Sequence, residues 1–504
     1  MIKRRSIMKK FTKILSAMLA LLLLISAMAF VTSCNKKDET ENTGGSATVS
    51  TDESLSSLEI KDMGGREFAM LWPEYISAEG HFMYNELDVE STSGSVIEEA
   101  VYDRNVIVKA TYNAKLRVDV MQYSKIASSI KTQYGAGESS YDAIATMLDK
   151  MSPLALEGVL TDFNELEYYD NSQEWWNHDV MQALSIVNKR YFGSGDIIYS
   201  DDLYPYVVYA NTALAEELQI TDNFYELVKN KEWTLEKFHE LAVIAVADLD
   251  ADGEEASSMN DRFGAVDGTS FARALYYSAG KGVITLDKQG YPTWEMTTEH
   301  AESVLSRIIR MWHTDSAVVD ADTQISGKKV TAFEIMDMFN SNQMLFMPGD
   351  LKAAQAFTTM DNALEDYALL PIPLWDENSE YICVMNSAVV IGIPTMAKDR
   401  DDICLILSAM GRESVTTLTP AFFETVLTYR YMKNPESVET LELILDSVVP
   451  RDVADIQGWG GFMKEFSNMV VTGSNTFSSY YGGNISKARS ELDKYITQLD
   501  NINK

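Results

Sequence analysis

The sequence has little cysteine, little histidine and little positive charge. Its 504 residues include three cysteines, too few for a disulfide framework in a chain of this length. Lysine and arginine total 42 against 75 aspartates and glutamates, which gives a formal net charge of −33. A surface this acidic repels DNA, RNA and anionic lipid headgroups. The composition therefore disfavours both a disulfide-dense scaffold and a nucleic-acid-binding protein.

The common catalytic and nucleotide-binding motifs are also missing. There is no Gly-x-Ser-x-Gly elbow, no Walker loop, no dinucleotide glycine fingerprint and no His-Glu-x-x-His. The five histidines stand singly, without the spacing of metal ligands: His81, His178, His239, His300 and His313. The sequence therefore nominates no catalytic residue and no cofactor. The abundant carboxylates leave a glycosidase-type pair open, but no particular pair stands out.

The N-terminal residues have the pattern of a leader. Six lysines and arginines within residues 1–13 precede an apolar run over residues 14–30, which ends at Val31-Thr32-Ser33-Cys34. This is the organisation of a secretory signal peptide, and the tetrapeptide resembles a bacterial lipobox, in which the cysteine is lipidated. An uncleaved transmembrane anchor is the alternative. We expect residues 1–33 to be removed and Cys34 to hold the protein, through lipid, at the extracellular face of the cell membrane.

A polar segment comes directly after the leader. Residues 34–57 contain one leucine, no aromatic residue and many Ser, Thr, Asn, Gly and acidic residues. Such a segment buries too little apolar surface to offset the entropy of ordering it. We interpret it as a disordered tether and expect the folded part to begin near Leu58.

The folded part alternates strand-like and helical patterns. A strand-like run over residues 66–72 ends at Pro73, and residues 96–112 place apolar side chains on one helical face. Leu116, Val118 and Val120 alternate with charged residues as in a half-buried strand, and residues 141–148 form another short apolar run. Interleaved strands and helices predict an α/β fold with a largely parallel sheet.

Aromatic and acidic residues near turns predict a binding site for sugar. Flat amphipathic rings suit sugar faces, and carboxylates beside them accept hydrogen bonds from hydroxyl groups. For each aromatic residue taken alone, plain packing is the alternative. The predicted ligand-binding residues are Trp72, Tyr75, Asp149, Tyr204, Tyr206, Asp350, Trp375 and Trp459.

Two further patterns leave alternatives open. Asp248, Asp250, Asp252 and Gly253 match the opening of a calcium loop, but Met259 stands where the bidentate glutamate belongs, so a solvated acidic loop is the alternative. No metal ligand is therefore nominated. Cys383 and Cys404 fall in apolar runs and are interpreted as buried thiols, with a disulfide between them as the alternative.

The order of several segments resembles the extracellular solute-binding lipoproteins of ABC importers, in the branch associated with sugars. The similarity extends over most of the chain after the tether. The segments that carry it are Tyr141–Ile144, Leu154–Phe163, Tyr204–Leu218, Lys231–Phe238 (with its Trp-Thr-x-x-x-Phe pattern) and Phe339–Phe346.

The resemblance implies two α/β lobes that are joined by crossovers and close on a ligand. It places residues 58–200 and 375–432 in the first lobe, and residues 201–374 and 433–504 in the second. It also implies capture of a small solute, expected to be a carbohydrate or oligosaccharide, by a monomer that delivers it to an ABC permease and is not an enzyme. A surface glycan-active enzyme, or a glycan-binding adhesin or sensor, is the alternative.

Overall fold

A computed structural model describes residues 58–504, except residues 75, 78–79, 82–84, 90–95, 186, 254–256, 268–269, 322–324, 326–328, 358–359, 361–363, 365, 424–434 and 503–504. Leu58–Lys504 forms one compact unit, distinct from Met1–Ser57. The predicted signal peptide, Cys34 and the tether lie outside the described residues, as does Tyr75.

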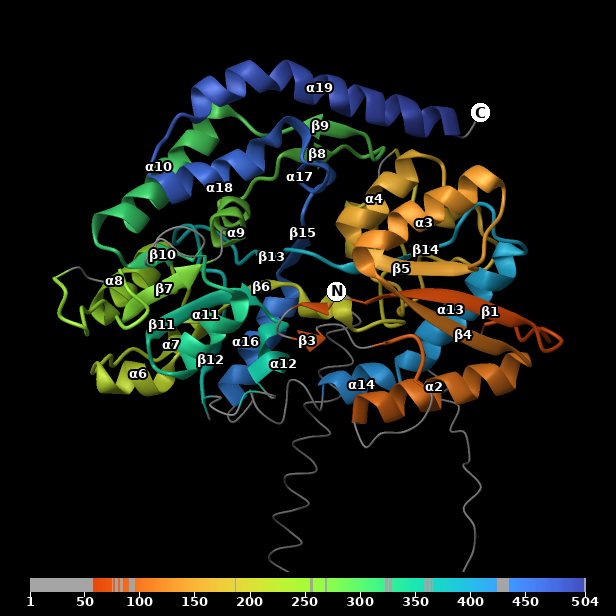
Figure 1. Cartoon of the computed structure of the whole chain (residues 1–504), viewed down its shortest axis with the longest axis horizontal. Helices are drawn as coiled ribbons and strands as arrows, with labels where there is room; N and C mark the ends of the chain where they lie inside the picture. Colours follow the sequence, from red (N-terminus) through yellow and green to blue (C-terminus); the bar gives the residue numbers. More distant parts are fainter. Residues whose placement is uncertain are drawn as a thin grey trace, which may run out of the picture. The chain divides into compact units, whose positions relative to one another are not determined.

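The first sheet has four strands in the order β14-β5-β1-β4 (Figure 1). Their bounds are Glu67–Glu74 (β1), Lys115–Gln122 (β4), Ala143–Met147 (β5) and Val389–Gly392 (β14). β1 runs parallel to β4 and β5, and β14 runs antiparallel to β5. The helices around this sheet are Val96–Tyr112 (α2), Tyr123–Ala136 (α3), Leu148–Leu156 (α4), Arg400–Ser414 (α13) and Leu418–Phe422 (α14). Helices connect its parallel strands, as the predicted α/β class requires.

The second sheet has five strands in the order β10-β7-β11-β6-β12. Their bounds are Tyr206–Ala210 (β6), Phe263–Asp267 (β7), Val318–Asp320 (β10), Met344–Asp350 (β11) and Ala368–Pro371 (β12). β7 is parallel to β10 and β11, whereas β6 is antiparallel to β11 and β12. The carboxyl ends of β7, β10 and β11 therefore share one edge of the sheet.

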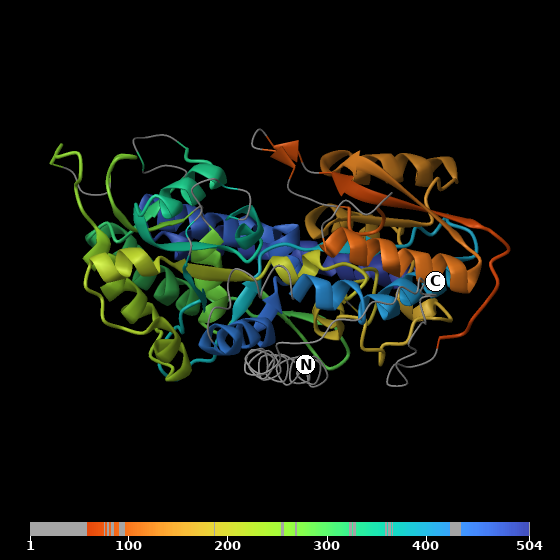
Figure 2. The ribbon, with the colours of Figure 1, turned by 90° about the horizontal axis from the view of Figure 1, so that it is seen from below.

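Eight helices accompany the strands of the second sheet; Figure 2 shows them from below. They are Thr212–Glu217 (α6), Phe224–Lys229 (α7), Leu235–Ala245 (α8), Ser270–Ser278 (α9), Thr298–Thr314 (α10), Ala332–Asn340 (α11), Ala353–Phe357 (α12) and Pro435–Asp446 (α16).

Shorter elements complete the unit. Three strand pairs are Ile76–Ser77 (β2) with Gly80–His81 (β3), Ile284–Leu286 (β8) with Pro292–Trp294 (β9), and Cys383–Met385 (β13) with Val448–Pro450 (β15). The remaining helical elements are Phe163–Glu165 (η1), His178–Ala183 (α5), Ser200–Leu203 (η2), Val453–Gln457 (α17), Trp459–Gly461 (η4), Phe462–Thr472 (α18) and Phe477–Ile502 (α19). α19 contacts α10 and α18 and also α4, so it touches the helices of both sheets.

The first strand does not end at Pro73, as its proline suggested. β1 continues to Glu74, and Pro73 pairs in register with Met121 of β4. On its other side β1 pairs with β5 only at Met70 and Leu71. Proline is tolerated in a sheet at a position where no neighbouring strand needs its N–H as a hydrogen-bond donor. Pro73 is at such a position, because β5 does not pair with β1 there.

The stretch after β12 is bonded to the second sheet and its helices, and the lobe boundary between residues 374 and 375 stays a prediction. The N–H of Leu374 donates to the carbonyl of Trp233 over 3.0 Å, and the Tyr381 hydroxyl also bonds back to the second-sheet helices. The Trp233 indole donates to the Pro371 carbonyl over 2.9 Å. The proline-rich stretch is thus held against the second sheet.

Cys383 and Cys404 are both buried free thiols. Burial raises the pKa of the Cys383 thiol to about 11 and that of Cys404 to about 12. This agrees with the buried-thiol interpretation and not with a disulfide between them.

Candidate functional site

Three aspartates end three adjacent strands of the second sheet. Asp267 is the last residue of β7, Asp320 the last of β10 and Asp350 the last of β11. Asp320 pairs in register with Asp267, and β11 runs parallel to β7 beside them. Open α/β sheets bind ligands outside the carboxyl ends of their strands. This edge of the second sheet is therefore the candidate site.

Asp267 is held by partners on both sides. The Tyr206 hydroxyl donates to its Oδ1 over 3.0 Å, and the N–H of Phe271, in the first turn of α9, lies 3.1 and 3.2 Å from its two oxygens. Burial and the neighbouring carboxylates raise the pKa of Tyr206 well above its usual value, so its hydroxyl stays protonated. Asp267 thus positions Tyr206 at the edge.

Asp350 differs because part of its carboxyl group is free. Its Oδ1 is buried and has no hydrogen-bond partner among the described residues. Burial raises the pKa of Asp350 to about 7, although nearby Lys352 and a hydrogen bond with the Asn386 side chain lower it. A buried carboxyl oxygen without a partner carries a desolvation penalty of about 1–3 kcal/mol that a ligand hydroxyl could remove.

Lys352 and Tyr204 lie next to Asp350. The Lys352 Nζ is 3.5 Å from the Tyr204 hydroxyl and 5.5 Å from the centre of its ring. Burial lowers the pKa of Lys352 to about 8, although the negative charges of Glu86 and Asp350 raise it. The site therefore combines a lysine, a tyrosine and a carboxyl group, and the proton occupancies of the lysine and the carboxyl group change near neutral pH.

Glu86, which is distant in sequence from Asp350 and Lys352, is the third member of this charged group. Its Oε2 accepts the N–H groups of Tyr199 over 2.7 Å and Ser200 over 2.9 Å, at the start of η2. Burial raises the pKa of Glu86 to about 7. Because Lys352 interacts electrostatically with both Glu86 and Asp350, the three groups titrate as a coupled set.

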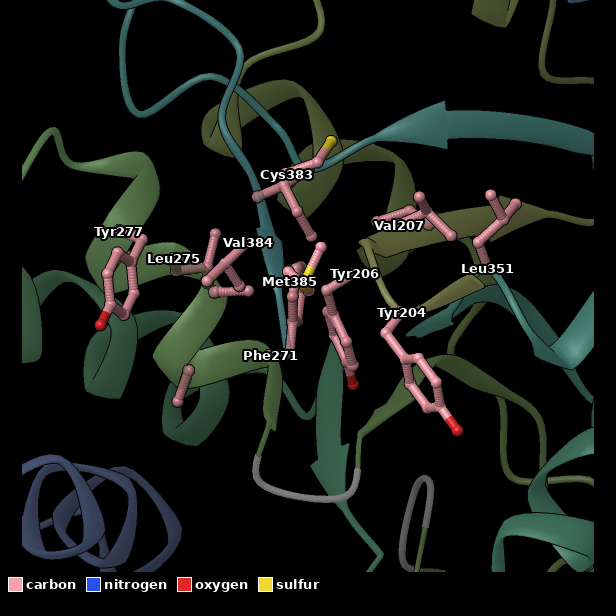
Figure 3. Packing of buried hydrophobic residues seen from close by; sticks show 14 of the residues in the cluster. Tyr204, Tyr206, Val207, Phe271, Leu275, Tyr277, Leu351, Cys383, Val384 and Met385 are labelled. Atoms are coloured by element: carbon pink, nitrogen blue, oxygen red, sulfur yellow. The ribbon is translucent and has the colours of Figure 1, made fainter. Parts of the chain in front are cut away.

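Backbone hydrogen bonds fix these side chains against the segment that enters β6. The N–H of Leu351 donates to the Pro205 carbonyl over 2.9 Å, and that of Lys352 to the Leu203 carbonyl over 2.8 Å. Figure 3 shows the Tyr204 and Tyr206 rings with their hydroxyl groups pointing to the same side. The two tyrosines and Asp350, all predicted from the sequence, are thus brought together.

The other described residues of the predicted site have different surroundings. Trp72 is 1% exposed within β1, rather than in a loop. The Asp149 side chain is 49% exposed in the first turn of α4 and pairs with Lys150. The Arg307 guanidinium lies 4.2 Å from the centre of the Trp375 ring.

Trp459 is also packed rather than open to solvent. It is 8% exposed and makes an edge contact with Tyr495 of α19, with ring centres 4.9 Å apart. The alternative of plain packing therefore describes its present environment, and its role in ligand binding stays a prediction.

Sequence reasoning missed Asp267, Glu86, Lys352 and Asn386. Asp267 had a usable signal, because it comes after the apolar run Phe263–Val266 as Asp350 comes after its own strand residues. Glu86 and Lys352 had none, since their partners are distant in sequence and become neighbours only through the fold.

The acidic loop after α8 assembles differently from the calcium pattern. Carboxylate oxygens of Asp248, Asp250 and Asp261 lie within 4.8 Å of one another, so that Asp261, rather than Asp252, completes the group. Asp248 accepts the N–H groups of Ala251 over 2.6 Å and Gly253 over 2.9 Å. These bonds already explain the turn, so the choice between calcium and a solvated loop stays open.

The two sheets, their helices and the site at a strand edge define the class of fold. It is the mixed α/β, two-lobed periplasmic-binding-protein-like fold, as predicted. No protein-family model and no curated protein matches the sequence. Among the described residues, none of the helices combines the length and the apolar character that crossing a membrane requires.

Solved structures carry the comparison. The chain is similar to the ABC substrate-binding protein Lmo0181 of Listeria monocytogenes, in complex with cycloalternan, with 13% identity, a TM-score of 0.51 and coverage of 87% of this chain and 98% of that one. It is also similar to the extracellular solute-binding protein of Staphylococcus aureus in complex with maltose, with 12% identity, a TM-score of 0.54 and coverage of 86% of this chain and 97% of that one. A third similar structure is a sugar transporter of Rhizobium etli in an open conformation, with 11% identity, a TM-score of 0.55 and coverage of 86% of this chain and 99% of that one. These three neighbours are described as binding or transport proteins.

Proposed function

We propose that the chain is an extracellular solute-binding protein that captures a carbohydrate, in particular an oligosaccharide, and delivers it to an ABC permease. The fold supports this proposal, because its structural neighbours include complexes with cycloalternan and maltose. The observation that carries it is the unpaired Oδ1 of Asp350 at the carboxyl edge of the second sheet. A sugar hydroxyl would satisfy this oxygen.

Lipid anchoring at Cys34 belongs to the same proposal. The support for it is the sequence Val31-Thr32-Ser33-Cys34 directly after the apolar run. One acyl chain alone binds membranes only marginally, so a stable anchor needs a cysteine that carries more than one. Expression of the full chain and of Cys34→Ala in a bacterial host, followed by membrane fractionation and mass analysis, tests it; unchanged mass and retention in the variant would contradict it.

Ligand-induced stabilisation tests capture. The protein is heated with and without maltose, maltotriose, cycloalternan, a short peptide and a polyamine, and each mixture is then assayed for product. A binding protein gains stability of RT ln(1 + [L]/Kd), about 2.7 kcal/mol at a hundredfold excess over Kd, with the sugar unchanged. Released product would favour a glycan-active enzyme instead. Stabilisation by the peptide or the polyamine alone would remove the sugar assignment.

A further inference from the structure

One tyrosine hydroxyl group holds the turn between β11 and α12, residues 350–354. The Tyr209 hydroxyl donates between two carbonyl oxygens, that of Asp350 over 3.1 Å and that of Leu351 over 3.0 Å. It also accepts the N–H of Ala354 over 3.2 Å. A hydroxyl group has one donor and two acceptor positions, so this single group bonds the backbone at both ends of the turn.

The bond to Ala354 lies at the start of a helix. Ala354 is the second residue of α12, and the first N–H groups of a helix have no acceptor within it. The same N–H lies 3.2 Å from the Leu351 carbonyl. The Tyr209 hydroxyl therefore adds an acceptor for the first turn of α12 and ties that turn to the end of β11.

The ring that carries the hydroxyl group is itself fixed by packing. Tyr209 is 0% exposed. Its ring makes edge contacts with Phe357 and Tyr367, with ring centres 5.4 Å apart in each pair, and with Phe339 at 6.4 Å. Edge contacts between aromatic rings favour a defined geometry, so the position of the hydroxyl group is well determined.

The register of the strands shows how Tyr209 reaches the candidate site. In the antiparallel pair of β6 and β11, Tyr209 lies opposite Met347 and Tyr206 lies opposite Asp350. Successive side chains of a strand point to opposite faces of the sheet, so Tyr206 and Tyr209 leave β6 on different faces. Tyr209 therefore acts on the site through the backbone of the turn and not through its own contact with a ligand.

We propose that Tyr209 is a positioning residue, whose hydroxyl group fixes the turn and with it the direction of the Asp350 carboxyl group. The N–H groups of Leu351 and Lys352 bond to the segment that enters β6, and the Tyr209 hydroxyl bonds to carbonyl groups of the same turn. The turn is thus held through both kinds of backbone group. The role rests on the proposed function, since Asp350 is the group assumed to touch the sugar.

The first test needs no ligand. Tyr209→Phe removes the hydroxyl group and keeps the ring with its aromatic contacts. Hydrogen exchange of wild type and variant is followed by mass spectrometry on overlapping peptides that cover the turn. The N–H of Ala354 should exchange about tenfold faster in the variant, because it loses one of its acceptors. Unchanged exchange throughout the turn overturns the proposal.

Tyr381→Phe is the matched control. Tyr381 is 8% exposed, and its hydroxyl donates to the Val228 carbonyl of α7 over 3.0 Å. This variant removes one buried tyrosine hydrogen bond without altering a partner of the turn. It should leave hydrogen exchange in the turn and maltotriose binding unchanged. If it speeds exchange in the turn as much as Tyr209→Phe does, the effect is a general loosening and the proposal is wrong.

The second test separates positioning from a general effect on stability. Calorimetry measures maltotriose affinity for wild type, Tyr209→Phe, Asp350→Ala and the double variant. Tyr209→Phe alone should weaken binding about tenfold, and it should add little in the Asp350→Ala background, where the group to be positioned is absent. Losses that simply add would show that Tyr209 supports the fold without acting through Asp350, and they would refute the proposal.

Two further outcomes are decided by the exchange measurement. If Tyr209→Phe fails to fold, a protected Ala354 N–H in the wild-type protein supports the proposal, and exchange at the rate of an open loop overturns it. If wild type binds none of the sugars, the proposed function fails, whereas the comparison of exchange rates still decides whether the Tyr209 hydroxyl holds the turn.

Discussion

The carboxyl edges of the two sheets carry similar residues in different surroundings. In the first sheet, Asp149 lies two residues after the end of β5, and its side chain is 49% exposed and lies 2.7 Å from the Lys150 ammonium. In the second sheet, β11 ends at Asp350, with an oxygen buried and unpaired and Lys352 two residues on. A similar acid–lysine pattern thus gives a solvated ion pair at one edge and a coupled buried group at the other.

The difference arises from the segment that comes after each strand. After β5 the chain turns at once into α4, and Asp149 falls in its first turn, where a negative charge suits the helix dipole. After β11 the backbone is instead drawn onto the segment before β6 by the N–H groups of Leu351 and Lys352. Binding chemistry is therefore expected at the second edge, where burial makes an unpaired oxygen costly.

The largest contrast should appear in stability. Asp267→Ala leaves the Tyr206 hydroxyl and the Phe271 N–H without their acceptor. Two buried groups without partners should lower the free energy of unfolding by about 3 kcal/mol. Asp149→Ala, at the exposed edge, should cost less than about 0.5 kcal/mol. Urea denaturation of both variants measures the contrast, and equal losses would show that the two edges do not differ in burial.

The pH dependence of stability sharpens the comparison. Because burial raises the pKa of Asp350 to about 7, the folded state retains a proton that the unfolded state loses above about pH 4. Stability from this group therefore falls as the pH rises from about 4 to about 7, by on the order of 4 kcal/mol. Asp350→Asn should flatten that decline. Lys352 acts at higher pH, because burial lowers its pKa in the folded state to about 8. Its contribution to the stability of the fold rises as the pH increases from about 8 to the pKa that lysine has in the unfolded chain.

The profile is measured by urea denaturation at intervals of pH. Glu86→Gln is the companion variant, because burial raises the pKa of Glu86 to about 7 as well. Each variant should remove part of the decline. A slope that neither substitution changes would mean that both carboxyl groups titrate normally in the folded protein.

The next largest effect is expected in ligand affinity. Asp350→Asn keeps the shape of the side chain but puts a neutral amide where a carboxylate would accept a hydroxyl hydrogen bond. We expect maltotriose binding to weaken about tenfold, equivalent to about 1.4 kcal/mol. Asp149→Asn, predicted from the sequence as part of the same site, is the matched variant in the first sheet. Calorimetry decides between them, and a larger loss in Asp149→Asn would move the site to the other edge.

The sequence predicted the elements better than the site. Threonine is favoured at the start of a helix, and the Thr234 side chain accepts the N–H of Lys237 at the start of α8. Trp312 lies on the apolar face of α10 and is 3% exposed. Both outcomes arise from local rules, namely the preference for threonine at a helix start and the spacing of apolar residues along one face.

The site was only partly predictable, because its neighbours are set by the fold. Tyr204, Tyr206 and Asp350 stood out as polar or aromatic residues at strand boundaries, and the structure brings them together. Trp72 carried a similar signal, since Pro73 suggested the end of a strand, but β1 continues past it. Glu86 reaches the site through bonds to Tyr199 and Ser200, which lie 113 and 114 residues away in the sequence, and no local pattern reveals such a contact.

The smallest expected effect concerns the two lysines. Lys150→Met removes only an ion pair with Asp149 in which the two side chains are 35% and 49% exposed. Exposed pairs contribute about 0.2–1 kcal/mol, so the loss of unfolding free energy should be no more than about 1 kcal/mol and should shrink further in high salt. Lys352→Met removes a buried cation that acts on both Glu86 and Asp350, and it should shift the pH profile of stability, which Lys150→Met should leave in place. Denaturation of both variants at low and high salt measures this. A salt-sensitive loss at Lys150 larger than that at Lys352 would contradict the contrast between a solvated first edge and a buried second edge.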